Sequence, residues 1–295
     1  DGKFIRDVVR LAIKPIWNAY NFFTLYANAD GVRASLVTLS EAEGSKIPRQ
    51  TRDDRNIMDR YILAKCNGAV LEIEKALNAY DTPSACESVL QFFDALNNWY
   101  IRRNKERFWK SKHDADKQAA YDTLYTVLTT MCRAAAPLLP FTCEEIYKNL
   151  TGEESVHLAM YPSLRGEAEV LQKISPHELS ADEVNIGLMD WTRSVCNSAL
   201  AIRNKLNIRV RQPLKTMTFV GVFFKEAPNY EFYRRIIEDE INIKNIIQEN
   251  DVSKYAILKL SINSAVLGKR LPAQMKQILP ASKKGEWKSL EDGSV

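Results

Sequence analysis

Apolar residues recur every three or four positions through most of the first half of this 295-residue chain. That spacing places them along one face of an α-helix, because the helix repeats about every 3.6 residues. The pattern predicts long helices over residues 3–26, 53–79, 82–110 and 114–135. Four amphipathic helices bury their apolar faces most simply against one another, as an antiparallel helix bundle. We therefore expect the chain to be mainly α-helical.

Prolines and capping residues set the expected boundaries of these helices. Pro15 should kink or split the first helix near residues 13–14, because proline lacks a backbone N–H and crowds the preceding turn. Thr82 followed by Pro83 is typical of a helix start, since threonine can accept a hydrogen bond from a free amide of the first turn. The third helix should therefore begin at this pair.

Two capping boxes occur beyond the fourth helix. Thr142, with Glu145 three residues later, matches such a box and predicts a short helix that ends near Leu150. A second box over Ser180–Glu183 opens a helix that runs to about Lys205. The acidic, loop-like sequence between these two helices should separate the bundle from the C-terminal part of the chain.

A smaller unit of mixed structure is expected after that helix. Four segments are predicted in it from apolar alternation or helical spacing: strands over 217–224 and 256–262, and helices over 230–240 and 271–279. We expect two domains, a helical bundle over 1–165 and a C-terminal helix with a small α+β unit over 166–295. Because the first residues carry no initiator methionine, we also expect the sequence to begin inside a longer protein.

The sequence carries no recognised signature of a catalytic, nucleotide or metal site. It contains no G-x-x-x-x-G-K-[ST], G-x-G-x-x-G, H-E-x-x-H or G-x-S-x-G pattern, and its three histidines stand apart from cysteines and acid pairs. Because no C-x-x-C pair occurs, we interpret all five cysteines as small buried apolar side chains in a reducing compartment: Cys66, Cys86, Cys132, Cys143 and Cys196. No apolar run approaches the roughly 20 residues that cross a bilayer. We expect no catalytic residue, no metal and no membrane partner.

The small net charge of +4 conceals two strongly basic segments. The first, residues 97–112, contains six basic residues against one acid, together with four aromatic residues. Helical spacing puts four residues on one side: Trp99, Arg103, Arg107 and Lys110. Basic groups there can bind RNA phosphates, and unpaired bases can stack on aromatic or guanidinium planes. The same spacing also allows a structural role, in which the rings are core and the arginines either pair with acids of a neighbouring helix or form a solvated face.

The second basic segment, residues 203–215, contains five basic residues and no acid. Residues 144–190, between the two segments, hold ten acids and three bases, so positive charge is concentrated along the chain. Concentrated positive charge favours a polyanionic partner. Arg203 and Lys205 also have a structural interpretation, because basic side chains are favoured at the C-terminus of a helix.

Several segments are similar to motifs of the isoleucyl-tRNA synthetases. Asn98–Trp109 closely resembles their N-W-Y-I-R-R-x-R-x-R-F-W signature and departs from it at Lys105, where the family more often has arginine. Three further segments resemble family motifs: Met58–Lys65 the D-R-W-I-L-[AS]-[KR] motif, Pro137–Tyr147 the A-P-[FIL]-x-P-F-x-x-E-x-[IL]-[WY] motif, and Ser155–Pro162 the S-V-H-L-x-x-[WY]-P motif. Downstream, Ile208–Leu214 resembles a basic family segment that ends in [KR]-[VI]-R-Q-P-L.

This resemblance implies the anticodon-binding part of a cytoplasmic class I synthetase, whose catalytic and editing domains lie elsewhere in the same chain. ATP and Mg²⁺ would belong to that catalytic domain, because its H-I-G-H and K-M-S-K-S motifs are missing from this sequence, and no cofactor is expected here. The implied partner is the anticodon stem-loop of tRNA(Ile), with no DNA partner. One alternative is a helical protein–protein interaction module of a multi-subunit assembly. Another is a hydrolase with Cys143 or Cys196 as nucleophile, although neither has a histidine partner nearby in the sequence.

On this basis we expect an RNA-binding surface with two regions. The first region contains Trp99, Arg102, Arg103, Lys105, Arg107 and Trp109. The second region contains Arg203, Lys205, Arg209 and Arg211. In both regions the positive side chains would hold phosphates, and unpaired bases could stack on aromatic or guanidinium planes.

Overall fold

The structure is a computed structural model, and it forms two units. It describes residues 10, 13–32, 56–162, 181–221, 227–249, 251, 254–255 and 261–284. Unit 1 is Asp1–Arg193 and unit 2 is Ser194–Val295, so the division falls inside helix α10 (Ala181–Lys205). The expected boundary between residues 165 and 166 lies outside the described residues, as does the capping residue proposed at Ser180.

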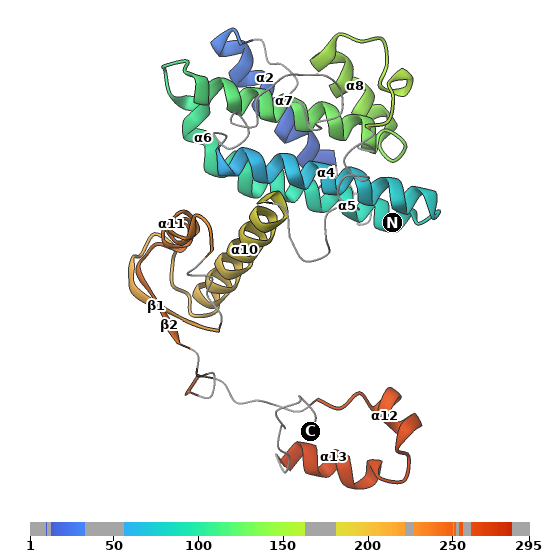
Figure 1. Cartoon of the computed structure of the whole chain (residues 1–295), viewed down its shortest axis with the longest axis vertical. Helices are drawn as coiled ribbons and strands as arrows, with labels where there is room; N and C mark the ends of the chain where they lie inside the picture. Colours follow the sequence, from blue (N-terminus) through green and yellow to red (C-terminus); the bar gives the residue numbers. More distant parts are fainter. Residues whose placement is uncertain are drawn as a thin grey trace. The chain divides into compact units, whose positions relative to one another are not determined.

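Unit 1 is a bundle of helices, as the periodicity predicts. Its elements are α2 (Lys14–Asp30), α4 (Ile57–Asn78), α5 (Thr82–Ala95), the π-helical segment η2 (Leu96–Ile101), α6 (Arg102–Trp109), α7 (Ala115–Ala135), α8 (Pro140–Thr151) and the 3-10 turn η3 (Val156–Leu158). Helix α7 packs against α2, α4, α6 and α8, and Figure 1 shows α4 and α5 side by side. Each long helix buries its apolar stripe, with Ile62, Phe92 and Leu128 almost fully removed from solvent. The mainly α prediction is confirmed.

Proline and glycine delimit α2. The helix begins at Lys14, with Pro15 in its first turn, and Arg10 and Ile13 before it have π-helical hydrogen bonding. The predicted kink or split near residues 13–14 stays a prediction, because most residues before Ile13 lie outside the described part of the chain. The helix ends where Gly31 adopts a positive φ of 63°, a backbone conformation that side chains disfavour.

Two predicted helix caps are wrong. The cap of α5 is Asp81, whose Oδ1 accepts from the backbone N–H of Ser84 at 3.1 Å, so Thr82 is instead the first residue of the helix. Helix α8 already begins at Pro140, because proline suits the first turn of a helix, and this places Thr142 inside that turn. In both places the helix, which has a proline in its first turn, begins earlier in the sequence than the threonine suggested.

The third predicted helix contains a π-helical interruption. Segment η2 separates α5 from α6, and the Asn97 side-chain amide donates to the carbonyl oxygens of Phe93 and Pro15, both at 2.9 Å. The bond to Pro15 ties η2 to α2, and the bond to Phe93 ties it to the preceding α5. A π turn holds more residues than an α turn, so α6 is rotated relative to a regular continuation of α5. A prediction that assumes one regular α-helix through η2 therefore assigns side chains of α6 to the wrong face.

Unit 2 contains a small β-α-β arrangement after the end of α10. Strands β1 (Leu214–Val220) and β2 (Ile243–Glu249) pair in parallel, and α11 (Tyr230–Ile241) connects them and packs against β2. Parallel pairing requires such a crossover connection. Helices α12 (Ser264–Arg270) and α13 (Met275–Lys284) follow. No helix among the described residues combines the length and apolar composition that a bilayer crossing requires.

The α+β character of unit 2 is confirmed, but the predicted strands are only partly right. Strand β1 starts three residues before the predicted 217–224, and residues 222–226 lie outside the described part of the chain. The second strand is β2, which was not predicted, whereas most of 256–262 is not described. The sequence shows no turn signal between α11 and β2, because a single residue, Asn242 with a φ of 51°, makes the whole turn.

Candidate nucleic-acid interface

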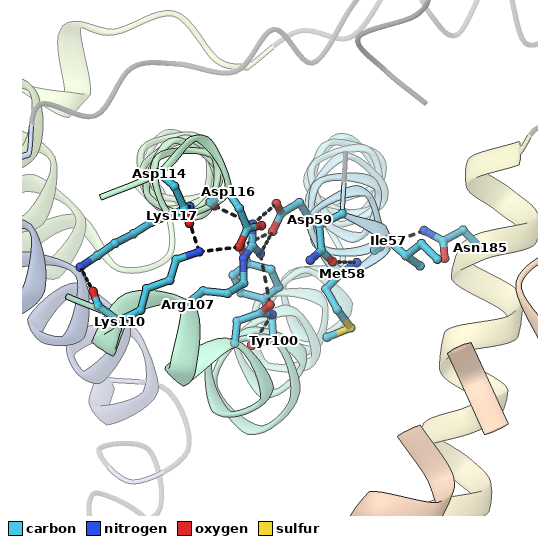
Figure 2. A network of polar contacts seen from close by, with 12 residues as sticks. Ile57, Met58, Asp59, Tyr100, Arg107, Lys110, Asp114, Asp116, Lys117 and Asn185 are labelled. Carbon is cyan, nitrogen blue, oxygen red and sulfur yellow. Dashed lines mark hydrogen bonds and ion pairs between the residues drawn. The ribbon is translucent and has the colours of Figure 1, made fainter. Parts of the chain in front are cut away.

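Arg107 faces the interior of the bundle. Its Nη1 lies 2.7 Å from Asp59 Oδ1 and its Nη2 lies 2.8 Å from Asp59 Oδ2, a bidentate pair that Figure 2 shows between α6 and α4. The Asp59 side chain is 1% exposed and that of Arg107 is 11% exposed. Nη2 also lies 2.8 Å from Asp116 Oδ1. The expectation that Arg107 lines an exposed RNA surface is therefore wrong, because carboxylates of the same unit already neutralise and cover it.

Tyr100 completes the surroundings of this ion pair. Its hydroxyl donates to Asp59 Oδ1 at 2.6 Å. Burial, reinforced by the adjacent Asp59 charge, raises the pKa of the Tyr100 phenol well above its usual value. Burial alone would lower the pKa of the Arg107 guanidinium, but the hydrogen bonds and charge of Asp59 raise it overall. The group therefore consists of a neutral phenol donor and a charged pair.

The ionic network continues from α6 into α7. Lys110 Nζ lies 2.7 Å from Asp114 and 3.0 Å from Asp116. Lys117, which is almost fully buried, lies 2.6 Å from Asp30 and donates to the carbonyl oxygen of Lys110 at 2.8 Å. These contacts, most of which Figure 2 shows, give basic side chains near the end of α6 partners within unit 1.

Trp99 lies beneath a group of arginines. Its side chain is only 4% exposed, and its Nε1 has no hydrogen-bond partner among the residues that the structure describes. The Cζ atoms of Arg103, Arg193 and Arg102 lie 5.4, 5.9 and 6.0 Å from the centre of its ring system. Trp99 therefore does not line an exposed surface, contrary to expectation, because its ring is covered. Its position instead suits a platform that holds guanidinium groups through cation–π contacts.

Arg193 was not identified from the sequence. It comes from α10, and it donates to the Tyr61 hydroxyl at 3.0 Å and pairs with Asp94 at 2.9 Å. The Tyr61 hydroxyl in turn donates to Asp190, which also pairs with Lys65. These side-chain contacts join the part of α10 within unit 1 to α4 and α5, and no local pattern reveals them.

The outward face of α6 carries Arg102, Lys105 and Trp109. Their spacing of three and four puts them on one side of the helix, away from Asn104 and Phe108, which are buried. Trp109 is 55% exposed, and its Nε1 donates to the Tyr26 hydroxyl at 2.7 Å. Lys105 Nζ lies 5.9 Å from the centre of the Trp109 ring system. We call these three residues, together with the half-buried Arg103, the α6 surface.

In the second predicted region, Arg203 is buried. Its side chain is 3% exposed, and its guanidinium donates to three backbone carbonyl oxygens of unit 2, those of Arg209, Gln212 and Asn242, each at 3.1 Å. The expectation that Arg203 contacts RNA is therefore wrong, because its donors are occupied inside the fold. Lys205, Arg209 and Arg211 are exposed, as the sequence predicted.

The cysteines do not suggest a reactive site. All five are thiols outside any disulfide, and four are buried, whereas Cys86 is exposed, contrary to expectation. Cys143 and Cys196 are at most 1% exposed, which leaves a nucleophile at either position inaccessible. Within the described residues, no group of three or more histidine, cysteine, aspartate or glutamate side chains is arranged to hold a metal ion.

Curated relatives of this chain include several isoleucine–tRNA ligases. The protein from Rickettsia akari (strain Hartford) is 41% identical over 99% of this chain and 28% of its own length. The protein from Rickettsia bellii (strain OSU 85-389) is 43% identical over 97% of this chain and 25% of its own length. The protein from Wolbachia pipientis wMel is 39% identical over 100% of this chain and 26% of its own length. The chain thus spans about a quarter of the length of these relatives.

A family model, the anticodon-binding domain of tRNA ligase, matches residues 59–218. The match begins at the buried Asp59, includes the whole α6 surface and ends within β1. The resemblance to isoleucyl-tRNA synthetases expected from the motifs is confirmed by the relatives and by this match. Because the matched segment comprises more than half of its 295 residues, the chain belongs to the family of anticodon-binding domains of tRNA ligases.

Proposed function

We propose that this chain binds the anticodon stem-loop of isoleucine tRNA, as the anticodon-binding part of an isoleucine–tRNA ligase. The family match and the names of the relatives support tRNA as the partner and isoleucine as the amino acid. Charging of the tRNA, with its ATP and Mg²⁺, then takes place in catalytic and editing domains outside this sequence. The contribution of this chain is to hold the distant end of the tRNA.

The observation that carries the proposal is the exposed, fixed indole of Trp109. More than half of this side chain is exposed, and its hydrogen bond to the Tyr26 hydroxyl holds the ring in one orientation. Lys105 lies beside the ring and adds a positive charge. A fixed aromatic ring next to a cation suits an unpaired base with its phosphate, because the base stacks while the cation neutralises the backbone.

Arg102 and Arg103 support the same surface. Both guanidinium groups lie against the buried Trp99 ring, and Arg102 is exposed. Contact with an indole restricts the motion of a guanidinium, so less conformational entropy is lost when it binds a phosphate. We propose that these two arginines contact the RNA backbone, while Arg107 and Trp99 support them from within the bundle.

Trp109→Ala should weaken binding of isoleucine tRNA by about 5-fold to 150-fold, because one base–aromatic stack contributes about 1–3 kcal/mol. Trp109→Phe should recover part of the affinity, since it restores a ring but not the indole N–H. Fluorescence anisotropy with labelled tRNA would measure both variants. Unchanged binding by the alanine variant would remove Trp109 from the interface.

The double variant Arg102→Gln/Arg103→Gln should bind the same tRNA about 10-fold to 100-fold more weakly, because charged hydrogen bonds to phosphates are lost. The slope of log affinity against log salt concentration should also fall, by up to about one unit for each lost phosphate contact. The matched control is Lys75→Gln/Lys148→Gln, which removes two exposed charges from α4 and α8. An equal effect in the control would mean that only net charge matters. Retention of a protein partner, with tRNA affinity unchanged by either variant, would favour the interaction-module alternative.

A further inference from the structure

The connection between α10 and β1 is held in one conformation by internal hydrogen bonds. We call residues 206–213 the Arg203 loop. The Arg203 guanidinium makes the three bonds described above. In addition, the backbone N–H of Ile208 donates to the Arg203 carbonyl oxygen at 2.9 Å, and the backbone N–H of Gln212 donates to the Arg209 carbonyl oxygen at 3.0 Å. Because both ends of the loop are bonded to the same arginine, its backbone is fixed before any ligand arrives.

Asn242 provides a second support from the junction of α11 and β2. Its side-chain amide donates to the Val210 carbonyl at 2.9 Å, and its own carbonyl accepts from the Leu214 amide at 3.1 Å. The same carbonyl also accepts from Arg203. The middle of the loop is therefore attached to the β-α-β part of unit 2.

The outer side of the Arg203 loop and its flanks is strongly positive. Four cations there have exposed side chains: Lys205, Arg209, Arg211 and Lys215. Residues 203–215 contain no acid, and none of these four forms an ion pair with a carboxylate within the described part of the chain. Crowded like charges repel one another, and a polyanion relieves that repulsion.

The burial of Arg203 strengthens this interpretation. A buried guanidinium is costly without a carboxylate partner, and among the described residues the Arg203 guanidinium donates only to backbone carbonyl oxygens. Five donors in a rigid fork can reach several carbonyls at once, which a single ammonium group cannot do. The arrangement fixes a cationic loop that would otherwise be free to disperse its charges.

We propose that the Arg203 loop is a preorganised contact for the RNA phosphate backbone, with Arg209 and Arg211 as the contacting side chains and Arg203 as their positioning residue. This inference rests on the proposed tRNA-binding function and adds a second contact in unit 2. Exposed Leu206 and Val210 beside these cations provide apolar surface for ribose and base faces.

The test measures the affinity of the full 295-residue chain for an isoleucine tRNA transcript over a series of salt concentrations. Arg209→Gln/Arg211→Gln should weaken binding about tenfold or more and lower the log–log salt slope by up to about two units. The matched control is Arg235→Gln/Lys276→Gln, which removes two exposed charges of unit 2 from α11 and α13 and should change neither quantity.

Arg203→Lys separates positioning from contact. Lysine keeps the charge but lacks the planar guanidinium that bonds three carbonyl oxygens, so binding of the transcript should weaken about 2-fold to 10-fold. The salt slope should stay unchanged, because the same phosphates are contacted once the RNA is bound. Should Arg203→Lys fail to fold, the double variant of exposed residues decides the proposal.

Each outcome has a distinct meaning. If the unaltered chain does not bind the transcript, the proposed function and this inference both fail. If Trp109→Ala weakens binding but Arg209→Gln/Arg211→Gln does not, this inference alone is overturned. The same holds if the double variant loses only binding to vesicles that contain phosphatidylserine, because the loop would then recognise an anionic lipid surface.

Discussion

Arg107→Met is expected to lower the free energy of unfolding by about 3–5 kcal/mol, the range seen when one partner of a buried ion pair is removed. The substitution keeps most of the side-chain volume but leaves the Asp59 carboxylate, 1% exposed, with the Tyr100 hydroxyl as its one remaining side-chain partner in the described part of the chain. Such a carboxylate cannot recover its hydration. Urea unfolding of the full chain, followed by helical circular dichroism, would measure the loss.

Two further variants make this test specific. Lys112→Met removes an exposed charge close to the end of α6 and should change the free energy of unfolding by less than about 0.5 kcal/mol. Asp59→Leu/Arg107→Met removes both charges and should be less destabilised than Arg107→Met, since no buried charge is left unpaired. A loss below about 1 kcal/mol in Arg107→Met would show that the pair is not structural, and would return Arg107 to the candidate RNA contacts.

Phe108→Ala is expected to cost about 3–5 kcal/mol, as is typical for removal of a buried aromatic ring. Phe108 is 1% exposed and makes edge-to-face contacts with Phe22 of α2 at 5.0 Å and with Tyr121 of α7 at 5.1 Å. Loss of the ring would leave a cavity where three helices meet. The same urea titration would measure this change.

The neighbouring position provides the control for this prediction. Trp109→Ala removes a larger side chain that is 55% exposed, so it should destabilise the chain much less than Phe108→Ala. Phe108→Leu should fall between Phe108→Ala and the unaltered chain, because leucine fills part of the cavity. Equal losses at positions 108 and 109 would contradict the division of α6 into a buried and an exposed face.

Helix α6 thus combines two functions in eight residues. Its inner face, with Asn104, Arg107 and Phe108, holds α4, α6 and α7 together. Its outer face carries the α6 surface that we propose for RNA. The first set of variants should change stability and the second should change affinity, so the two roles are separable by experiment.

Local patterns predicted the bundle well. The spacing of apolar residues located α4, α7 and α11 to within a few residues, because burial of one helical face imposes a period that neighbouring residues display together. The motifs around Asn98–Trp109 also indicated the correct family. Patterns failed where one residue changes the backbone, as at Asn242 before β2, or where the helix changes type, as in η2.

The sequence by itself determined the helices, the family and the total positive charge of two segments. Only the tertiary structure decided which of those charges face solvent. Arg107 pairs with Asp59, which lies 48 positions away in the sequence, and the Arg203 guanidinium donates to the carbonyl oxygen of Asn242, which lies 39 positions away. A count of charges cannot distinguish such arginines from the exposed Arg102 or Arg211, because hydrogen bonds and ion pairs depend on which groups folding brings within about 3 Å.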